Sequence, residues 1–495
     1  MKPLTSNILL AIARDVSAEQ IRLKQFVTDF WTVIEPGRAF IDSEYLDVIC
    51  EHLEAVTYGK LLRLIVNIPP RYGKSNIVTV MWPVWEWTQF PSRRFMFCSY
   101  SSGLSTQHSI KRRRILESPD FRARWGNLVC MATDQNVKTE FENTRRGLMT
   151  ATSTGGTVTG KGGDTLIGDD VLNPDMAESV AERERTLDFI DHTWSSRLDD
   201  KRTGKMVFVE QRLHAQDVTA HLTKRGGWTQ LIMPVSYDER TEYILPMSGR
   251  VIVKESGQLL APERDSEAEL APLKILMGSR AYQAQYLQRP SAEEGALLKR
   301  AWFRSYNPAM PMRGELFRIW SWDTAVKEGE QNDYSVGTYW SATTEGFCLL
   351  HRVKGKMEYP ALKREVMEQF AARPAQALLV EDASSGQSLI QDLKLLKLPI
   401  VPVKVDKDKV VRVNMVAPTI EAGMVFLPEA QSCPWVVDFR ENLCEFPYAE
   451  HDDDVDSMTQ AVQYMRARTS GAPAAGYSTN VGAPWTATKQ RPDWA

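Results

Sequence analysis

The stretch LLRLIVNIPPRYGKS, residues 61–75, decides the fold of the first half of the chain. Residues 61–68 form an aliphatic, β-branched run that predicts a buried strand, and Pro69-Pro70 ends it. A tight turn then leads to Gly73-Lys74-Ser75 and to a predicted helix over 75–89. Backbone N–H groups and the helix dipole at such a turn favour anions, so this pattern predicts a phosphate-binding loop.

Each side chain of this loop has a candidate role. Lys74 would reach the terminal phosphates of a nucleotide, and the Ser75 hydroxyl would ligate Mg²⁺. Arg71 adds a cation that an ATP-hydrolysing enzyme can use against the γ-phosphate charge. The usual pattern has a glycine five residues before Gly73, where this chain has Ile68. A surface turn is therefore the alternative interpretation of the tripeptide alone.

The second half of a nucleotide site is predicted at residues 165–170, TLIGDD, an apolar strand that ends in two acids. Asp169 can hold Mg²⁺ through water and Asp170 can orient the attacking water, although a helix-capping pair is the alternative. A following strand ends just before Gln211 and Arg212, which become candidate γ-phosphate sensors. A solvated strand end is the alternative for those two residues.

Spaced carboxylates in the last third of the chain predict a second chemical centre. Asp323 ends the strand predicted over 317–323, Glu381 ends another strand, and Asp453 and Asp456 lie three apart on a late helix. Carboxylates in this order can gather two Mg²⁺ or Mn²⁺ ions, which is how a nuclease activates water against a phosphodiester. Turn or helix capping is the alternative for any one of these acids.

Composition excludes several classes of protein. The 495 residues suggest two to four domains, and the net charge of −3 neither requires nor excludes DNA as a partner. The six cysteines form no CxxC pair, which argues against zinc and a disulfide framework and favours a reducing compartment. Neither a convincing signal peptide nor a membrane-spanning stretch is present, so no membrane partner is expected.

Strands alternate with helices from residue 59 to about 235, which predicts a mainly parallel α/β sheet. The pattern weakens to about residue 300, apart from a predicted helix over 266–287. A second α/β segment follows and opens with three consecutive strands, and the residues from 469 onward are rich in Gly, Ala, Pro, Ser and Thr.

The chain resembles the large terminase subunit of tailed phages from about residue 50 to 465. The stretches that carry the resemblance are NIPPRYGKS, TVTGKGGDTLIGDD, QRLHAQD, YQAQYLQRP, SWDTAVKEGEQNDYSVGTYW, VEDASSGQSLIQDL, DKV and HDDDVDSMTQAV. Ile68 in place of the leading glycine is usual for that family. The resemblance implies an α/β protein with an N-terminal P-loop ATPase of the additional-strand class and a C-terminal RNase H-like nuclease with a mixed sheet.

The resemblance also implies domain boundaries and site residues. The expected segments are an N-terminal helical segment of the ATPase at 1–58, the ATPase core at 59–235, a linker or lid subdomain at 236–300, the nuclease at 301–468 and a flexible tail at 469–495. The family's phosphate-loop residues fall on Arg71, Lys74 and Ser75, and its ATPase acids fall on Asp169 and Asp170. Its nuclease acids fall on Asp323, Glu381 and the 452–456 helix, where we favour Asp456 and then Asp453.

The function that the resemblance implies is viral DNA packaging. ATP hydrolysis would drive double-stranded DNA into the procapsid, and the nuclease would cut concatemeric DNA at the start and end of packaging. The implied cofactors are ATP and Mg²⁺, with Mn²⁺ as an alternative at the nuclease. The implied partners are DNA, the portal protein, the small terminase subunit and further copies in a ring. The protein would act in the host cytoplasm, at the portal, and would be absent from the mature virion.

A cation from a neighbouring subunit would complete each ATP site in such a ring. Arg112, Arg113 and Arg114 are candidates, with a solvated or DNA-facing patch as the alternative. Three rival functions use the same residues: an RNase H-like recombinase or transposase without a motor, a capsid-assembly scaffold with both sites dead, and a helicase-nuclease. A recombinase would not need Lys74 or Asp169, and a scaffold would not need the intact acids.

Overall fold

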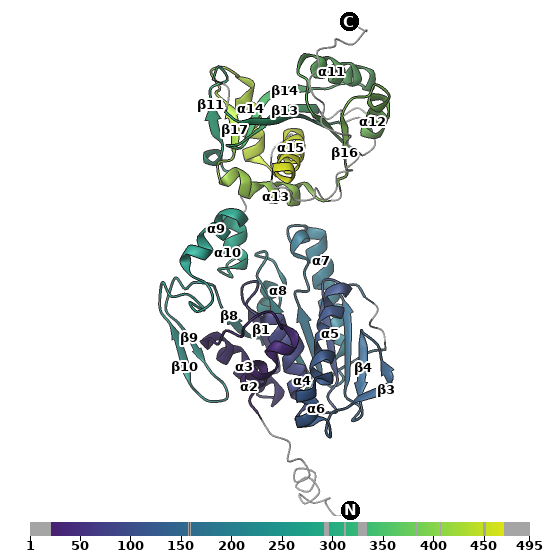
Figure 1. Cartoon of the computed structure of the whole chain (residues 1–495), viewed down its shortest axis with the longest axis vertical. Helices are drawn as coiled ribbons and strands as arrows, with labels where there is room; N and C mark the ends of the chain where they lie inside the picture. Colours follow the sequence, from purple (N-terminus) through teal and green to yellow (C-terminus); the bar gives the residue numbers. More distant parts are fainter. Residues whose placement is uncertain are drawn as a thin grey trace, which may run out of the picture. The chain divides into compact units, whose positions relative to one another are not determined.

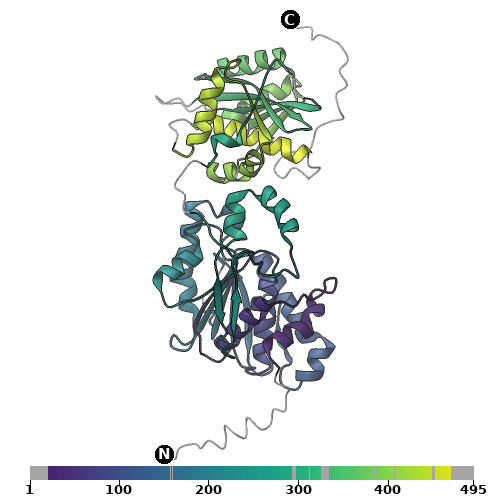
Figure 2. The same ribbon diagram turned by 90° about the vertical axis from the view of Figure 1, so that its left-hand side faces the viewer.

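The computed structural model describes residues 21–156, 158, 160–291, 297–310, 313–324, 334–382, 385–405, 407–448 and 452–469. The chain divides into two compact units between Ala292 and Glu293. Each unit is built around its own sheet (Figures 1 and 2). The predicted tail, Thr469 excepted, lies outside the described residues. The finer domain boundaries stay predictions.

The first unit contains an eight-stranded sheet with the order β3-β4-β5-β2-β6-β7-β1-β8. From β5 to β8 in this order, every pair of neighbouring strands is parallel. The pairs β3–β4 and β4–β5 are antiparallel. The strands are β1 (Arg63–Asn67), β2 (Phe95–Ser99), β3 (Met131–Asn136), β4 (Glu140–Asn143), β5 (Leu148–Ser153), β6 (Thr165–Asp169), β7 (Lys205–Glu210) and β8 (Thr229–Ile232). Because β7 stands between β1 and β6, the sheet has the additional strand that the resemblance implied.

Helices pack on both faces of this sheet. They are α2 (Leu23–Ile34), α3 (Glu44–Thr57), α4 (Trp82–Trp87), α5 (Ser102–Glu117), α6 (Pro119–Trp125), α7 (Val180–Asp188) and α8 (Val218–Arg225), with π-helical turns η1 (Asn76–Met81) and η3 (Phe189–Trp194) and 3₁₀ turns η2 (Pro174–Met176) and η4 (Ser195–Arg197). The helix predicted over 75–89 is thus a π-helical turn followed by α4. The antiparallel strands β3, β4 and β5 were not predicted from the sequence.

Residues 236–291 pack on the same core as the parallel sheet, through buried side chains such as Tyr237 and Leu245. They form the hairpin β9 (Thr241–Ile244) and β10 (Val251–Lys254), followed by α9 (Glu267–Met277) and α10 (Ser279–Gln285). The single helix predicted over 266–287 is interrupted at Gly278, whose φ of 77° is outside the helical region.

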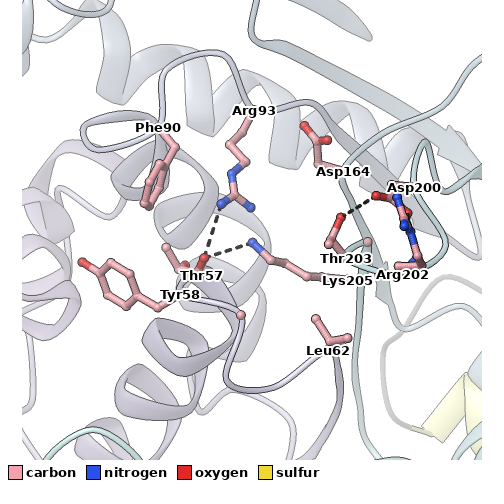
Figure 3. A pocket seen from close by; sticks show the side chains of 12 residues that line it. Thr57, Tyr58, Leu62, Phe90, Arg93, Asp164, Asp200, Arg202, Thr203 and Lys205 are labelled. Carbon is pink, nitrogen blue, oxygen red and sulfur yellow. Dashed lines mark hydrogen bonds and ion pairs between the residues drawn. The ribbon is translucent and has the colours of Figure 1, made fainter. Parts of the chain in front are cut away.

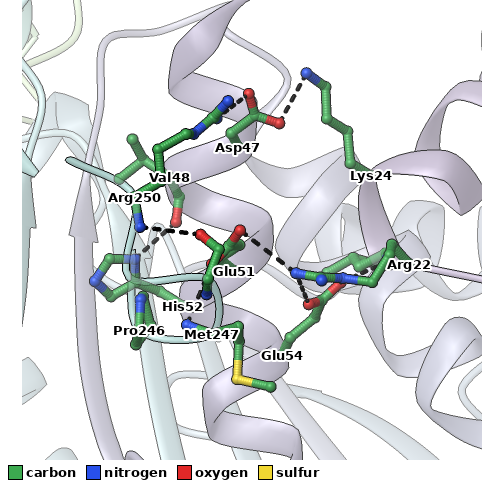
Figure 4. A network of polar contacts seen from close by, with 12 residues as sticks. Arg22, Lys24, Asp47, Val48, Glu51, His52, Glu54, Pro246, Met247 and Arg250 are labelled. Carbon is green, nitrogen blue, oxygen red and sulfur yellow. Dashed lines mark hydrogen bonds and ion pairs between the residues drawn. The ribbon is translucent and has the colours of Figure 1, made fainter. Parts of the chain in front are cut away.

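Hydrogen bonds and an ion pair connect this hairpin to α3 (Figure 4). Glu51 Oε2 accepts hydrogen bonds from the backbone N–H groups of Met247 at 3.2 Å and Ser248 at 2.9 Å. Arg250 Nη2 lies 2.6 Å from Asp47 Oδ2. The hairpin and the N-terminal helices are therefore one packed body, although they are about 200 residues apart in sequence.

The second unit contains a seven-stranded mixed sheet with the order β11-β17-β14-β13-β12-β15-β16. Its strands are β11 (Arg304–Tyr306), β12 (Glu315–Asp323), β13 (Ser335–Thr343), β14 (Phe347–Gly355), β15 (Ala377–Glu381), β16 (Ile400–Val403) and β17 (Val425–Pro428). Its helices are α11 (Tyr359–Ala372), α12 (Ser385–Leu395), α13 (Lys409–Glu421), α14 (Trp435–Glu445) and α15 (Asp453–Thr469), preceded by the 3₁₀ turn η5 (Arg300–Trp302). The three consecutive strands predicted from residue 317 onward are confirmed as β12, β13 and β14.

Alternation along β12 gives this unit two apolar layers. Ile319 belongs to the cluster formed with α13, α14 and α15, whereas Trp320 and Trp322 belong to the cluster formed with α11 and α12. Successive side chains of a strand point to opposite faces, so the sheet lies between these two helical layers. No helix in the described part of the chain is long and apolar enough to cross a membrane.

Candidate functional site

The carboxyl ends of β1, β6 and β7 lie side by side because the three strands are parallel. β1 runs into the predicted phosphate loop, β6 ends at Asp169, and β7 ends at Glu210. In open parallel sheets, ligands bind beyond the carboxyl ends of the strands. The topology therefore brings the two predicted halves of the nucleotide site together.

The phosphate loop has a left-handed backbone at two positions. Arg71 has φ of 70° and Gly73 has φ of 74°. The positive φ of Gly73 favours glycine at this position, because other residues rarely adopt it. The Arg71 side chain is exposed, and its backbone carbonyl accepts a hydrogen bond from Arg264.

The loop and the end of β6 are joined by three side-chain hydrogen bonds. Lys74 Nζ donates to Asp170 Oδ1 at 2.7 Å, and Ser75 Oγ donates to Asp169 Oδ1 at 2.9 Å. Thr79 Oγ1, one helical turn further on, donates to Asp169 Oδ2 at 2.6 Å. The pairing of loop residues with acids that the sequence predicted is thus present in the tertiary structure.

Burial controls the chemistry of the two acids. Burial raises the pKa of Asp169 above its usual value, although the hydrogen bond from Thr79 and the charge of Lys74 oppose the rise. Burial also raises the pKa of Asp170, against the opposing charge of Lys74. Asp170 is in a left-handed conformation with φ of 45°. A carboxylate with a raised pKa accepts a proton more readily, which suits a group that orients and polarises water.

The two predicted γ-phosphate sensors are placed differently. The backbone N–H of Gln211 donates to Asp170 Oδ1 at 3.4 Å, and Gln211 Oε1 is buried with no hydrogen-bond partner in the described part of the chain. Arg212 Nε instead donates to Asp217 Oδ2 at 2.8 Å. Gln211 therefore touches the acid pair, whereas the guanidinium of Arg212 is engaged at the start of α8.

Two titratable residues at this site were not predicted from the sequence. Glu210 is almost fully buried, and burial raises its pKa well above the usual value, with the charges of Asp217 and Asp170 adding to the rise. His108 Nδ1 lies 3.4 Å from Asp169 Oδ2, and burial lowers the pKa of His108 to about 3. The strand-end position of Glu210 was a usable signal, because the same signal identified Asp169, whereas nothing in the sequence places His108 there.

The suggestion that Arg112 acts on a neighbouring subunit or faces DNA is wrong. Its side chain is fully buried, with the guanidinium 3.5 Å from the centre of the Phe97 ring and Nη1 donating to Thr79 O at 2.8 Å. It supports the helix that carries Thr79 from within its own subunit. Arg114 is exposed and Arg113 lies 3.6 Å from Glu117, so both stay candidates.

The second predicted centre forms at the ends of β12 and β15. These are neighbouring parallel strands in which Trp322 pairs with Val380, so the next residues, Asp323 and Glu381, end adjacent strands. A Cβ on Gly386 would lie 1.9 Å from the carbonyl oxygen of Glu381, so only glycine lets α12 start this close to the strand.

Hydrogen bonds fix the acidic helix α15 against the same strand. Ser321 Oγ donates to Ser457 O at 2.8 Å, and Ser457 Oγ donates to Ser321 O at 2.8 Å. Ser457 Oγ also lies 2.6 Å from Thr338 Oγ1 of β13. This buried link holds the first turn of α15, and with it Asp456, next to the end of β12.

The acids of this centre repel one another. Burial raises the pKa of Asp323 well above its usual value, and the charges of Asp456 and Glu381 raise it further. Burial and the charge of Asp456 likewise raise the pKa of Glu381. Asp453 also acts on Asp323, so acids from two strands and a helix form one electrostatic cluster.

The aspartates of residues 452–456 differ in their partners. Asp454 is fully buried and accepts from Arg352 at 2.6 Å and Lys354 at 3.2 Å, away from the acid cluster. Asp452 and Asp456 lie 2.6 and 2.8 Å from Lys409 Nζ. Asp456 therefore belongs to the electrostatic cluster with Asp323 and Glu381. Its two carboxylate oxygens also contact cations, Lys409 and Arg412.

The oxygen ligands at both centres are of the type that binds divalent cations such as Mg²⁺. Carboxylates and hydroxyls are the hard oxygen ligands that Mg²⁺ prefers. Within the described residues, no three His, Cys, Asp or Glu side chains are close enough together to hold a metal ion as a group. Mg²⁺ usually keeps several waters and needs only one or two carboxylates, so this spacing does not conflict with Mg²⁺.

A cavity of about 420 Å³ lies at the other end of the first sheet (Figure 3). It is lined by residues that precede β6 and β7, including Asp164 and Thr203. Lys205 and Arg93 there donate to the Thr57 carbonyl at 3.0 and 3.5 Å. The amino ends of the strands form this cavity, so it is separate from the phosphate loop at their carboxyl ends.

Residues 320–465 match the model of the Terminase RNaseH-like domain family. The large terminase of a thermophilic bacteriophage has a similar fold, with a TM-score of 0.53 and 11% identity over 84% of this chain and 98% of that one. A structure of the same terminase in complex with ADP gives a TM-score of 0.50 and 12% identity over 83% and 98%. No curated protein matches the sequence.

Proposed function

We propose that this chain, a relative of phage large terminase subunits by its fold and its terminase RNase H-like domain, is the ATP-driven motor and nuclease of viral DNA packaging. ATP hydrolysis in the first unit would move double-stranded DNA into the procapsid. The second unit would cut concatemeric DNA at the start and end of packaging. The observation that carries the proposal is the presence, on one chain, of the Lys74–Asp170 pair and the Asp323–Glu381–Asp456 cluster.

The first unit has the groups that hydrolysis of ATP needs. The N–H groups of the phosphate loop and Lys74 would bind the phosphates, and Lys74 would then exchange its contact with Asp170 for a contact with phosphate oxygens. Asp170 would become available to orient the attacking water. Ser75 and Asp169 would hold Mg²⁺, which neutralises charge on the β- and γ-phosphates when bound.

The second unit has the acids of a metal-dependent nuclease. Asp323, Glu381 and Asp456, with Asp453 as a further ligand, would share two Mg²⁺ or Mn²⁺ ions, each held by one or two carboxylates, and the ions would supply Lewis-acid activation of water. The mutual repulsion of these carboxylates supports the proposal, because a bound cation would relieve it. A structural role alone gives no reason for acids to accumulate at one buried strand end.

The proposed partners are double-stranded DNA, the portal protein, the small terminase subunit and further copies of the chain in a ring. The proposed place of action is the host cytoplasm, at the portal of the procapsid, and the protein would not stay in the mature virion. Contacts with DNA would be made mainly to phosphates and would therefore weaken as salt increases.

Measurement of DNA-stimulated ATP hydrolysis by the Lys74→Ala variant tests the motor function. We expect a loss on the order of 10²–10³-fold, because a preorganised charge at the transferred phosphoryl group is removed. Lys60→Ala is the matched control, since Lys60 is exposed and its Nζ contacts Pro246 O at 3.4 Å. Equal rates for Lys74→Ala and the parent protein would reject the motor function.

A further inference from the structure

We propose that Lys409 and Arg412 of α13 bind the phosphate backbone of the DNA strand that is cut, and that they are held on Asp456 until a divalent cation displaces them. This inference deepens the proposed nuclease function and rests on it. Lys409 lies in the DKV stretch that carries the family resemblance, but no role was assigned to it or to Arg412.

The geometry places both cations on one acid. Lys409 Nζ lies 2.8 Å from Asp456 Oδ2, and Arg412 Nη2 lies 2.6 Å from Asp456 Oδ1. The two residues are three apart in the first turn of α13, so their side chains share one face of the helix. Lys409 also reaches Asp452 Oδ1 at 2.6 Å. Asp456 is only 6% exposed in its side chain, so the pairing shields it from solvent.

The contacts of Asp456 leave hydrogen-bonding capacity unused. Asp456 Oδ1 and Arg412 Nε are buried and have no hydrogen-bond partner in the described part of the chain. The close approach of Arg412 to Oδ1 is therefore a charge contact without an aligned hydrogen bond. A buried acceptor and a buried donor without partners are costly, so both groups would gain from a new ligand of the right sign.

The charges at this site explain why a divalent ion would replace Lys409 and Arg412 on Asp456. Asp323 interacts electrostatically with Glu381, Asp453 and Asp456, and Asp456 contacts both Lys409 and Arg412. Asp452 also contacts Lys409. Lys409 lies between Asp452 and Asp456, at 2.6 and 2.8 Å from their oxygens, so it neutralises part of this negative charge. A divalent ion on Asp456 would supply the positive charge that Lys409 and Arg412 supply now and would repel both.

The released cations are suited to phosphate. A guanidinium binds phosphate oxygens through two parallel donors, and an ammonium binds as a point charge. Both lie at the N-terminal turn of α13, where the helix dipole adds attraction for an anion. DNA entering a site that holds a metal ion would therefore meet Lys409 and Arg412 beside the scissile phosphodiester.

A calorimetric titration of the full-length protein with Mn²⁺ alone tests whether the metal ion displaces Lys409 from Asp456. We expect Lys409→Gln to bind Mn²⁺ roughly fivefold more tightly than the parent, as removal of a half-exposed competing ion pair allows. Lys404→Gln is the control, because Lys404 is an exposed lysine in the segment just before α13. Weaker Mn²⁺ binding by Lys409→Gln would show that Lys409 only orients Asp456 and would overturn the proposal.

Binding of a DNA duplex at several salt concentrations tests the phosphate contacts. In Ca²⁺, each of Lys409→Gln and Arg412→Gln should lower the slope of log K against log salt by about 0.9. Lys409→Arg should keep the parent slope. Without divalent ions the variants should match the parent, because the cations are then held on Asp456. A slope unchanged in Ca²⁺, or lowered equally without it, would overturn the proposal.

These results are separable from the proposed nuclease function. Cutting of plasmid by the parent and by Asp323→Ala reports whether the acid cluster is a nuclease at all. If both cut equally, the nuclease function fails. If only the parent cuts while the Mn²⁺ affinity and salt slopes are unchanged in the α13 variants, the nuclease stands and the roles of Lys409 and Arg412 fail.

Discussion

The hydroxyl of Tyr72, inside the phosphate loop, donates a hydrogen bond to Asp265 Oδ2 at 2.6 Å. The guanidinium of Arg264 lies 5.0 Å from the centre of the Tyr72 ring, and Tyr45 OH donates to Tyr72 O at 3.1 Å. A residue almost 200 positions later in the sequence thus holds the loop that would bind ATP. The segment before α9 therefore packs against the predicted phosphate loop and supports its left-handed backbone.

Removal of this contact should weaken nucleotide binding. Tyr72→Phe should lower the affinity for ATP roughly fivefold, because one hydrogen bond that preorganises the loop is lost. Titration with a fluorescent ATP analogue measures the effect. The double variant Tyr72→Phe, Asp265→Asn should be no weaker than Tyr72→Phe alone. Tyr58→Phe, which removes an exposed contact to Gln89 away from the loop, should leave the affinity unchanged.

The hydroxyls of Ser75 and Thr79, which both donate to Asp169, should affect stability and activity differently. Thr79→Val removes a buried hydrogen bond to a charged carboxylate and should cost about 1.5–3 kcal/mol of stability as well as activity. Ser75→Ala should lower stability less, because its hydrogen bond to Asp169 is only partly buried, and should mainly raise the Mg²⁺ concentration needed for ATP hydrolysis. Thermal unfolding and Mg²⁺ titration of the ATPase distinguish them. Equal destabilisation by both variants would contradict separate roles.

Glu210 should make the protein less stable as pH increases. Its pKa in the folded protein is well above the usual value because of burial and the charges of Asp217 and Asp170. The folded state therefore binds the proton more tightly than the unfolded state, so stability falls as pH rises from the unfolded pKa through the folded pKa. Glu210→Gln should raise the melting temperature at pH 8 by on the order of 2–4 °C, with a smaller gain at pH 5.

Glu239→Gln is the control for that experiment, because Glu239 is exposed. It should melt like the parent at both pH values. If Glu210→Gln melts lower than the parent at pH 8, the carboxylate of Glu210 stabilises the fold in its charged form, and the stated direction is wrong.

Two aspartates of the second unit should respond oppositely to the same substitution. Asp323→Asn should abolish DNA cutting and raise stability at neutral pH, because burial and the charges of Asp456 and Glu381 disfavour the charged form of Asp323. Asp454→Asn should lower stability by about 1.5–3 kcal/mol, because Arg352 loses its buried carboxylate partner and keeps only the exposed Asp438. Chemical unfolding and plasmid cutting measure the pair. A destabilised Asp323→Asn variant would contradict the electrostatic argument.

Local patterns were sufficient for the elements that carry the chemistry. The apolar run that becomes β1 and the acid-terminated strands β6, β12 and β15 were all predicted, since a buried strand and the turn after it have strong local signatures. The strands β3, β4 and β5 were not predicted. Their residues 131–153 are mostly polar or mixed, and antiparallel pairing at a sheet edge, rather than local propensity, makes them strands.

Charge contacts were beyond the reach of sequence patterns. Arg112 belongs to a run of four basic residues, 111–114, that suggests an exposed patch, yet helix packing buries it over Phe97. Lys409 and Asp456 are far apart in the sequence, and no spacing rule relates them. The contact between Tyr72 and Asp265 likewise joins segments far apart in the sequence, whereas the pairing of the loop of Lys74 with the acids of 169–170 was predicted.

The sequence by itself predicted a phosphate loop followed by an acid-ended strand, and determined a later series of strand-end acids with an acidic helix. These are local features, set by burial periodicity, turn residues and the chemistry of single side chains. Only the tertiary structure decided which acids share a site, which cations neutralise them and which charges are buried. Those properties depend on distance and desolvation, and both follow from the order of strands in the sheets rather than from spacing along the chain.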